Sequence, residues 1–585
     1  MDNVGTADAP VADHALADVL RVTDEVSARR LMDVLSPMAR WTKHAGTPEE
    51  LDSLAYVRDT LDELGFHTEL ISHDAYISLP VSARVEVDDD SLTALAVSFS
   101  RSTPAAGLTG RLVAVGRGTA ADYEGLDVTG CVVLIDGVPG PDQTIGAGSR
   151  GAIAQVHVSP HDKLHEMCVS PVWGSPGDDT VDRLPATAVC SVSATDGRRL
   201  REVAAAGGGI TVHTEIDTGW RPTPILVADL PSGRGGDEEP FVFFTGHHDT
   251  WHYGLMDNGT ANATMIEIAR IASAHRDRWQ RGLRLAFWSG HSQGRYSGSA
   301  WYADHHWEEL EARALVHVNI DSTGGNGNTV VADATSAAEL GELAQEALRT
   351  QAGQDWAGRR MHRAGDQSFW GIGVPAIFAN LSEQPIDPAL TNAQAAVFGG
   401  GPRKGNGTGW WWHTPEDTLD KIDPELLARD TRIYLHAVWR LLTDAALPLD
   451  FTRACEALVD RLRELQAASA DRLDLSVAIA RGLRAAELTG VLWAERDADP
   501  SWFNSVVHRL SRLLVPLDYT RGDRFRHDPA LFVGGLPGLS DAPRLAGLDP
   551  ESAEFRFLHS RLQRERNRIT VNLRDVVSFL EGVLE

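Results

Sequence analysis

The sequence FVFFTGHHD at residues 241–249 decides the fold class, because a continuous apolar run passes directly into polar residues. Two later segments repeat this pattern: LRLAFW at 283–288 is followed by SGHS, and LVHVNI at 315–320 is followed by DST. The segment VPAIFA at 374–379 has the same apolar character. Continuous apolar strands that alternate with helical stretches indicate a mostly parallel sheet covered on both faces. The sequence therefore predicts an α/β fold, a mostly parallel sheet with flanking helices.

Polar side chains follow each of these strands, at the rim where open α/β sheets bind their ligands. His247 follows the first strand, His291 the second and Asp321 the third, while His413 lies in the cluster WWWHTPEDT. One such residue alone is more often a packed or turn residue, so the prediction rests on their convergence at one rim. Histidine and aspartate together suit zinc or a similar divalent ion.

Two further aspartates fit a metal site at this rim. Asp249 comes two residues after His247, where it can accept the other ring N–H and fix the histidine tautomer. Asp257 lies in the loop before the next helix, where its carboxylate can face the rim and bridge two ions. The predicted metal ligands are therefore His247, Asp257, Asp321 and His413.

Outside this core the character of the sequence changes twice. Residues 15–81 and 219–446 carry the strand and helix pattern and form the predicted catalytic domain. Residues 82–218 contain short β-rich runs separated by Gly, Pro and Asp, which predict an inserted β-rich domain. Residues 447–585 consist of long amphipathic stretches at helical spacing, which predict a helical domain.

Composition limits the partners and the compartment. The formal net charge of −28 argues against nucleic acid and anionic membranes, both of which need a positive surface. The first residues lack the apolar core of a secretory signal, and no apolar run is long enough to span a membrane. The cysteines have no metal-binding or disulfide spacing, so a reducing cytoplasm is expected. They are Cys131, Cys168, Cys190 and Cys455.

Five segments together resemble a known family. GHHDTW, MDNGTANATMIEIARI, FWSGHSQGRYSGSAWYA, VNIDSTGG and WHTPEDT resemble the core of the dinuclear zinc exopeptidases, which include bacterial aminopeptidases, glutamate carboxypeptidase and the transferrin receptor. The resemblance covers nearly the whole chain. It implies a phosphorylase/hydrolase-like catalytic domain, a protease-associated-like domain at 82–218, and a transferrin-receptor-like helical domain at 447–585 that forms a homodimer.

The resemblance assigns roles to the residues at the rim. His247 matches the histidine on the first metal, and Asp249 matches the carboxylate that orients it. Asp257 matches the aspartate that bridges two metals. Asp321 matches the second carboxylate on the first metal, and His413 matches the histidine on the second. The implied cofactor is one or two divalent ions, most simply Zn²⁺.

The chain departs from the family pattern at one pair of positions. The family carries Glu-Glu where this chain has His291-Ser292; the first Glu is the general base and the second binds the second metal. Ser292 removes a carboxylate from the second metal, so the site holds either one ion or a weaker second one. His291 is either a proton acceptor, for which its ordinary pKa is suitable, or a replacement ligand. The sequence favours His291 as the base and Ser292 as a hydrogen-bond donor.

Three more residues are predicted to contact substrate. Trp412 ends a run of three tryptophans after a glycine-rich stretch (398–409), and three successive indoles do not all fit a core. Arg295 follows the His-Ser pair, and Asp366 lies in a loop before a strand.

Three functions remain open at this point. The first is metal-assisted hydrolysis of an amide bond in a short peptide. The second is hydrolysis of a small-molecule amide that is not a peptide. The third is a catalytically inactive, dimeric binding protein.

Overall fold

The computed structural model describes residues 9–236, 238–387 and 407–585. Three helices precede the first strand: α1 (Ala9–Thr23), α2 (Ala28–Leu35) and α3 (Pro48–Glu63). The Thr47 side chain caps α3 by accepting the N–H of Glu50, and Gly65, at φ +86°, follows the end of the helix. Most of the glycine-rich stretch at 398–409 lies outside the described residues.

The core sheet contains four parallel strands: β8 (Phe241–His247), β9 (Gly282–Trp288), β10 (Ala314–Asn319) and β11 (Ala376–Ile377). They lie in the order β9, β8, β10, β11, and β7 (Gly209–Leu230) pairs antiparallel with β9. The α/β prediction is therefore confirmed. The last strand is shorter than predicted, because Pro375 has no N–H to pair before its start and Phe378, at φ +61°, leaves the extended conformation after its end.

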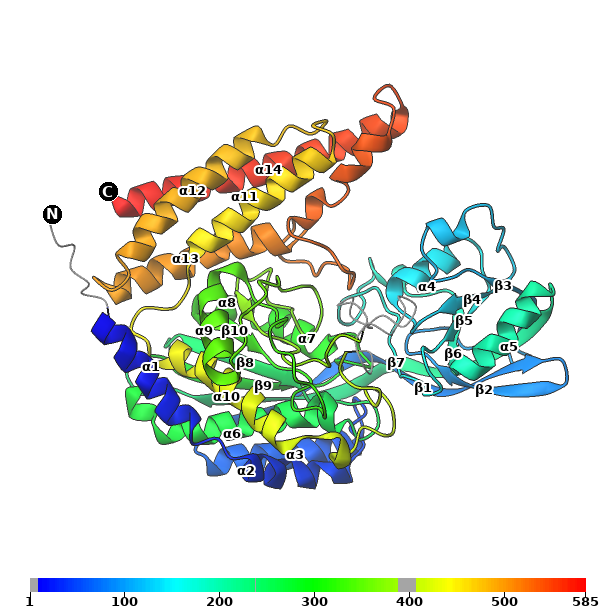
Figure 1. The fold of residues 1–585 in the computed structure, drawn as a ribbon, viewed down its shortest axis with the longest axis horizontal. Coiled ribbons are helices and arrows are strands. Elements are labelled where there is room, and N and C mark those ends of the chain that lie inside the picture. The colour runs from blue at the N-terminus through cyan, green and yellow to red at the C-terminus, as the bar shows by residue number, and fades with distance from the viewer. Residues whose placement is uncertain (1–8, 237, 388–406) are drawn as a thin grey trace.

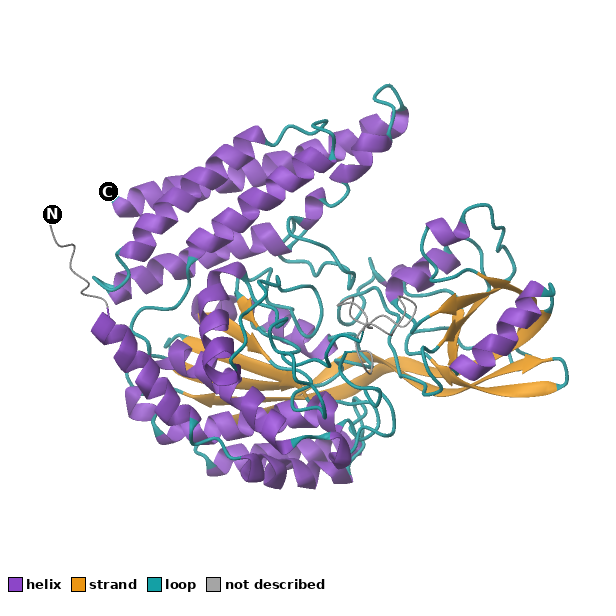
Figure 2. Cartoon of the chain, viewed as in Figure 1, coloured by secondary structure: helices purple, strands orange, loops and turns teal. Residues whose placement is uncertain are grey.

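Helices cover both faces of the core sheet, as Figure 2 shows. Successive residues of β8 point to opposite sides, so Val242 and Phe244 pack with α2, α6 and α10 while Phe241 and Phe243 pack with α7 and α8. The covering helices are α6 (Ala261–Ala274), α7 (Ser297–His305), α8 (Trp307–Arg313), α9 (Gly341–Ala352) and α10 (Pro424–Thr443). Burial on both faces explains why β8 is continuously apolar.

Two long strands join the core to the inserted region, as Figure 1 shows. β1 (His67–Val87) pairs antiparallel with β7 over most of its length, and residues 82 and 218, the predicted boundaries, lie inside these strands. Their outer halves pair with β2 (Asp90–Ala96) and β3 (Leu108–Ala114).

The inserted region is not simply β-rich. Beyond β3 it contains β4 (Val132–Asp136), β5 (Ala154–Val158) and β6 (Ala188–Val192), all parallel to one another. It also contains α4 (Pro141–Gly148) and α5 (Ala194–Ala205), which short β-like runs in the sequence did not predict. Parallel neighbours need long crossover connections, and these helices lie in the chain between or beyond the parallel strands.

The C-terminal region is helical, in agreement with its amphipathic sequence. It consists of α11 (Phe451–Ala468), α12 (Ser476–Ala494), α13 (Pro500–Tyr519) and α14 (Ala553–Leu584). Buried Arg512 of α13 joins it to the core by donating to the backbone oxygens of Leu310, Ala314 and Gly373. Within the described residues, no helix combines the length and the apolar character that crossing a bilayer requires.

Candidate metal centre

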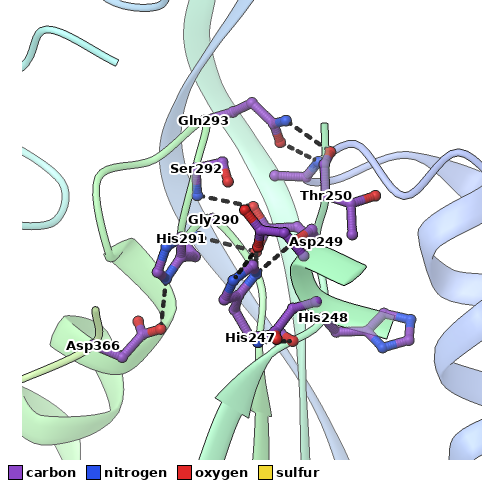
Figure 3. A network of polar contacts seen from close by, with 12 residues as sticks. His247, His248, Asp249, Thr250, Gly290, His291, Ser292, Gln293 and Asp366 are labelled. Atoms are coloured by element: carbon purple, nitrogen blue, oxygen red, sulfur yellow. Dashed lines mark hydrogen bonds and ion pairs between the residues drawn. The ribbon is translucent and has the colours of Figure 1, made fainter. Parts of the chain in front are cut away.

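Three neighbouring strands bring the predicted residues to one edge of the core sheet. His247 ends β8, His291 follows β9 by three residues, and Asp321 follows β10 by two. Because β8 lies between β9 and β10, the three side chains meet, and one possible ligand atom of each lies within 4.8 Å of the others. Figure 3 shows His247 and His291 side by side at this edge.

The carboxylate of Asp257 lies between two histidines. Its Oδ1 is 3.1 Å from His247 Nε2, and its Oδ2 is 3.0 Å from His413 Nε2. Asp321 Oδ1 lies 3.6 Å from the same His247 nitrogen. The structure therefore brings all four predicted ligands together, with Asp257 in the middle.

The hydrogen bonds of the three histidines fix which nitrogen faces the carboxylates. His247 Nδ1 donates to the backbone oxygen of Asp249 at 2.8 Å, and His413 Nδ1 donates to that of Glu166 at 2.6 Å. His291 Nδ1 contacts Asp366 Oδ2 at 2.7 Å. In each neutral ring Nδ1 then carries the hydrogen, and Nε2 offers a lone pair.

This arrangement fits a bound cation. Without one, the lone pairs of two neutral histidines face carboxylate oxygens at 3.0 and 3.1 Å, a contact between two acceptors. His247 Nε2 and Asp257 Oδ1 are also buried without a hydrogen bond of good geometry. Two atoms bound to one tetrahedral zinc ion are about 3.3 Å apart, close to the separations found here.

The electrostatics point the same way. Burial opposes the charged form of His247, but the carboxylates of Asp321 and Asp257 raise its pKa well above the ordinary value. Burial likewise opposes the charged form of Asp257, but the neighbouring imidazoles of His247 and His413 lower its pKa well below the usual range. A buried carboxylate that stays ionised suits a divalent cation.

His291 is not placed to share an ion with His247. Their rings lie face to face, with 3.7 Å between centroids and 17° between planes. An imidazole binds metal along a lone pair in its own ring plane, so two stacked rings do not direct their lone pairs to one point. This geometry favours the interpretation of His291 as a proton carrier rather than a replacement ligand.

The prediction for the carboxylate of Asp249 is wrong in detail. Its Oδ1 is 4.0 Å from His247 Nδ1, and the backbone oxygen of Asp249 accepts that hydrogen instead. The two carboxylate oxygens accept the backbone N–H groups of His291 and Ser292, as Figure 3 shows. Because the backbone oxygen of Asp249 binds the His247 ring, the Asp249 carboxylate is free to hold the loop that carries His291 and Ser292.

The prediction that Asp366 contacts substrate is also wrong. Its side chain is buried behind His291, where Oδ2 faces His291 Nδ1 and Oδ1 accepts from Ser299 Oγ at 2.7 Å. Burial opposes its ionisation, but the charge and hydrogen bond of His291 hold the pKa of Asp366 below its usual value. Both oxygens are occupied, so this residue positions His291.

An open cavity lies beside the centre. His291, Ser292 and Arg295 line it together with Trp412, so these predicted residues reach the same space. The Trp412 ring stacks on His413 at 3.5 Å, and Trp411 packs in the core. The remaining walls combine apolar and aromatic residues, such as Met167, Trp251, Tyr296 and Met361, with polar and charged ones, such as Asp333, Arg359 and Glu383.

Several supporting residues were missed from the sequence. Asp417 accepts the backbone N–H groups of Met256 and Asp257 and so holds the loop that carries the central carboxylate. Asn262 of α6 donates to the backbone oxygen of His247 at 2.7 Å. Glu166, which reaches His413, comes from the inserted region. Asp417 lies inside the quoted WHTPEDT motif, but Glu166 carries no signal that a single sequence reveals.

Comparison with known proteins agrees with this geometry. Residues 226–438, which contain every predicted metal ligand, match the family model described as peptidase family M28. β1, most of β7, the whole inserted region at 82–218 and α11–α14 lie outside the matched segment.

Relatives and solved structures were also found. The chain is 28% identical over 262 residues to a probable lipoprotein aminopeptidase of Mycobacterium tuberculosis, covering 43% of this chain and 49% of that protein. It is 25% identical over 250 residues to a probable glutamate carboxypeptidase of Zea mays, covering 40% and 33%. The chain thus spans half or less of these relatives.

The fold is similar to those of two solved structures. A peptidase M28 precursor from Shewanella amazonensis superposes with a TM-score of 0.57 and 17% identity, covering 73% of this chain and 97% of that one. A zinc aminopeptidase from Bacillus subtilis superposes with a TM-score of 0.54 and 19% identity, covering 72% and 96%.

Proposed function

We propose that this chain is a zinc-dependent hydrolase of amide bonds in short peptides. The observation that carries the proposal is the central carboxylate of Asp257, which faces the Nε2 atoms of two histidines whose other nitrogens are occupied. The M28 segment and the names of its relatives, aminopeptidases and glutamate carboxypeptidases, support a peptide substrate.

The principal ion would be held by His247, Asp257 and Asp321. Three protein ligands with an open position are typical of catalytic zinc sites. On the other side of Asp257, His413 stands with Ser292 at the position where the family has a glutamate. A neutral hydroxyl is a weaker zinc ligand than a carboxylate, so we propose one tightly bound ion and a weak second position.

A bound zinc ion polarises the substrate carbonyl and lowers the pKa of a coordinated water towards 7. Residues of the protein carry out proton transfer and positioning. His291 Nε2 accepts the proton of the attacking water and returns it to the leaving amine, while Nδ1 stays bonded to Asp366. Asp249 holds the loop of His291 and Ser292 through two backbone hydrogen bonds.

The cavity favours an apolar or aromatic residue next to the scissile bond. Trp412 and Trp251 line it close to His413, and Arg295 adds a guanidinium for a polar or anionic substrate group. The same lining, with the His291-Ser292 pair, favours a bulky small-molecule amide as the second candidate substrate class.

Turnover of a substrate panel tests both candidates. Purified protein should hydrolyse dipeptides and aminoacyl p-nitroanilides, lose this activity with 1,10-phenanthroline, and regain it with added Zn²⁺. Hydrolysis of aryl amides without any peptide turnover would favour the second candidate. An absence of zinc-dependent turnover on both panels would instead support a non-catalytic binding protein.

The resemblance also supports three proposals about the rest of the molecule. The inserted region would be a protease-associated-like domain, and α11–α14 would form a homodimer. Exposed apolar residues on two of these helices support the homodimer: Val477, Leu483 and Val491 of α12, and Phe557 and Val571 of α14. Light scattering on the purified protein tests the homodimer.

Four free, buried cysteines support a reducing compartment such as the cytoplasm.

A further inference from the structure

A chain of hydrogen bonds leads from the inserted region to His291. Trp173, in the segment between β5 and β6, places its indole Nε1 2.9 Å from Ser368 Oγ. Ser368 Oγ lies 2.9 Å from Ser299 Oγ, which lies 2.7 Å from Asp366 Oδ1. The other oxygen of Asp366 faces His291 Nδ1 at 2.7 Å.

The donor and acceptor properties of these groups allow only one direction for the series of hydrogen bonds. The indole Nε1 only donates, so the Ser368 hydroxyl accepts there and has its hydrogen left for Ser299. An ionised carboxylate only accepts, so the Ser299 hydrogen goes to Asp366. Every hydroxyl therefore accepts one hydrogen bond and donates the next, an arrangement in which neighbouring bonds strengthen one another.

The consequence falls on the tautomer of His291. A protonated Asp366 would be able to donate to Nδ1 and turn the hydrogen of the ring towards Nε2. A hydrogen bond from Ser299 stabilises the ionised carboxylate, which can only accept from Nδ1–H. Nε2 is then left as the basic nitrogen on the side of the cavity that His291 lines.

The residues that form this series of hydrogen bonds are buried and closely packed. Trp173 and the hydroxyl pair Ser299 and Ser368 are each at most 3% exposed. The Trp173 ring packs on Tyr296 with 4.2 Å between the ring centroids. The guanidinium carbon of Arg363 lies 4.2 Å from the centroid of the Trp173 ring. The same β5–β6 segment also contacts His413 through Glu166.

We propose that Trp173, Ser368 and Ser299 are positioning residues that hold His291 in its Nδ1–H tautomer, so that the inserted region sets the proton-accepting atom of the centre. This inference rests on the proposed function in so far as His291 carries a proton during hydrolysis. None of the three residues lines the substrate cavity, and their hydrogen bonds reach His291 through Asp366.

The test removes one donor at a time. Trp173→Phe keeps an aromatic ring on Tyr296 and Arg363, while Ser368→Ala and Ser299→Ala each delete one hydroxyl. Trp356→Phe is the matched control, because it deletes an indole donor, to the Ala334 backbone oxygen at 2.7 Å, that belongs to no chain reaching His291. Thermal melting of all four variants checks that each one folds.

Two readouts separate positioning from a merely structural role. Nitrogen-15 NMR of zinc-free protein labelled at the histidine rings, with His291→Asn to assign the signals, reports the tautomer. We expect the Nδ1–H signature of His291 in wild type and the control, and its loss or averaging in the three variants. We also expect kcat to fall about tenfold in Ser299→Ala and a few-fold in the other two, with KM and zinc affinity unchanged.

An unchanged His291 signature in all three folded variants would overturn the inference, even if their activity fell. A wild-type protein without turnover would count against the proposed function alone, because the zinc-free NMR comparison still decides whether the chain sets the tautomer.

Discussion

The two oxygens of Asp257 face unequal halves of the centre. On the Oδ1 side, His247 and a second carboxylate, Asp321, stand close by. On the Oδ2 side stands His413, and Ser292, which lines the same cavity, occupies the position where the resemblance implies a glutamate. In the proposed function the tightly bound ion lies on the Oδ1 side, because two carboxylates supply negative charge there.

The largest expected effect comes from breaking the stronger half. Asp321→Ala should remove the tightly bound ion and lower kcat/KM at least about a thousandfold, because the charge that retains the ion is lost. Zinc content and turnover are the measurements, with exposed Asp52→Ala as the control. Retention of a full ion by Asp321→Ala would show that the halves are not unequal in the proposed sense.

Breaking the weaker half should cost less. His413→Ala is expected to keep about one ion per chain and to lower kcat/KM about tenfold, because Asp257 loses one of its two partners. Elemental analysis beside steady-state kinetics measures both quantities. If this variant lost its ion as completely as Asp321→Ala does, His413 would belong to the principal site.

The comparison is sharpened by restoring the missing charge. Ser292→Glu should tighten the binding of a second zinc ion about tenfold or more, since a carboxylate joins His413 and Asp257 Oδ2. Zinc titration against a fluorescent chelator gives both affinities, and Ser292→Gln is the uncharged control. Equal second-ion affinity in the two variants would contradict the charge argument.

The smallest effect concerns a buried carboxylate outside the centre. Burial raises the pKa of Glu339 to about 7, assisted by Asp518 and opposed by Arg360. Its folded pKa lies above its unfolded value, so folding takes up a proton, and stability falls as the pH rises from about 4.5 to about 7. Above pH 7, Glu339→Gln should therefore raise the free energy of unfolding by about 1–3 kcal/mol, and with it the melting temperature. Near pH 4.5 the substitution should change both quantities little.

Melting curves of wild type and Glu339→Gln across this pH range make the comparison, with activity as an internal control. A constant difference at every pH would show that the substitution acts through packing and not through ionisation.

The sequence predicted the elements whose pattern is local. Residues 241–245 and 283–288 are continuously apolar, and both became buried strands of the core sheet. The meeting of His247, Asp257, Asp321 and His413 followed from the rule that parallel strands present their carboxyl ends at one edge, together with the resemblance. Long-range contacts were not predictable. Asp366 was predicted to contact substrate. Its side chain instead accepts a hydrogen bond from Ser299 of α7, a contact between residues far apart in the sequence.

The same limit applies to the inserted region. Its short apolar runs predicted strands, but nothing local to Glu166 or Trp173 indicates that this segment folds back onto the centre. For Asp249 the prediction named the correct partner, His247, but the wrong oxygen, because the sequence does not distinguish the backbone oxygen of a residue from its side-chain oxygens.

The most direct test of the account is the zinc content of protein purified without chelator, for wild type and His291→Ala, together with the turnover of each. The account predicts about one ion per chain in both proteins and a loss of hydrolysis only in the variant, because His291 handles protons and does not bind the ion. An ion present in wild type and absent from His291→Ala would make His291 a ligand and contradict the account.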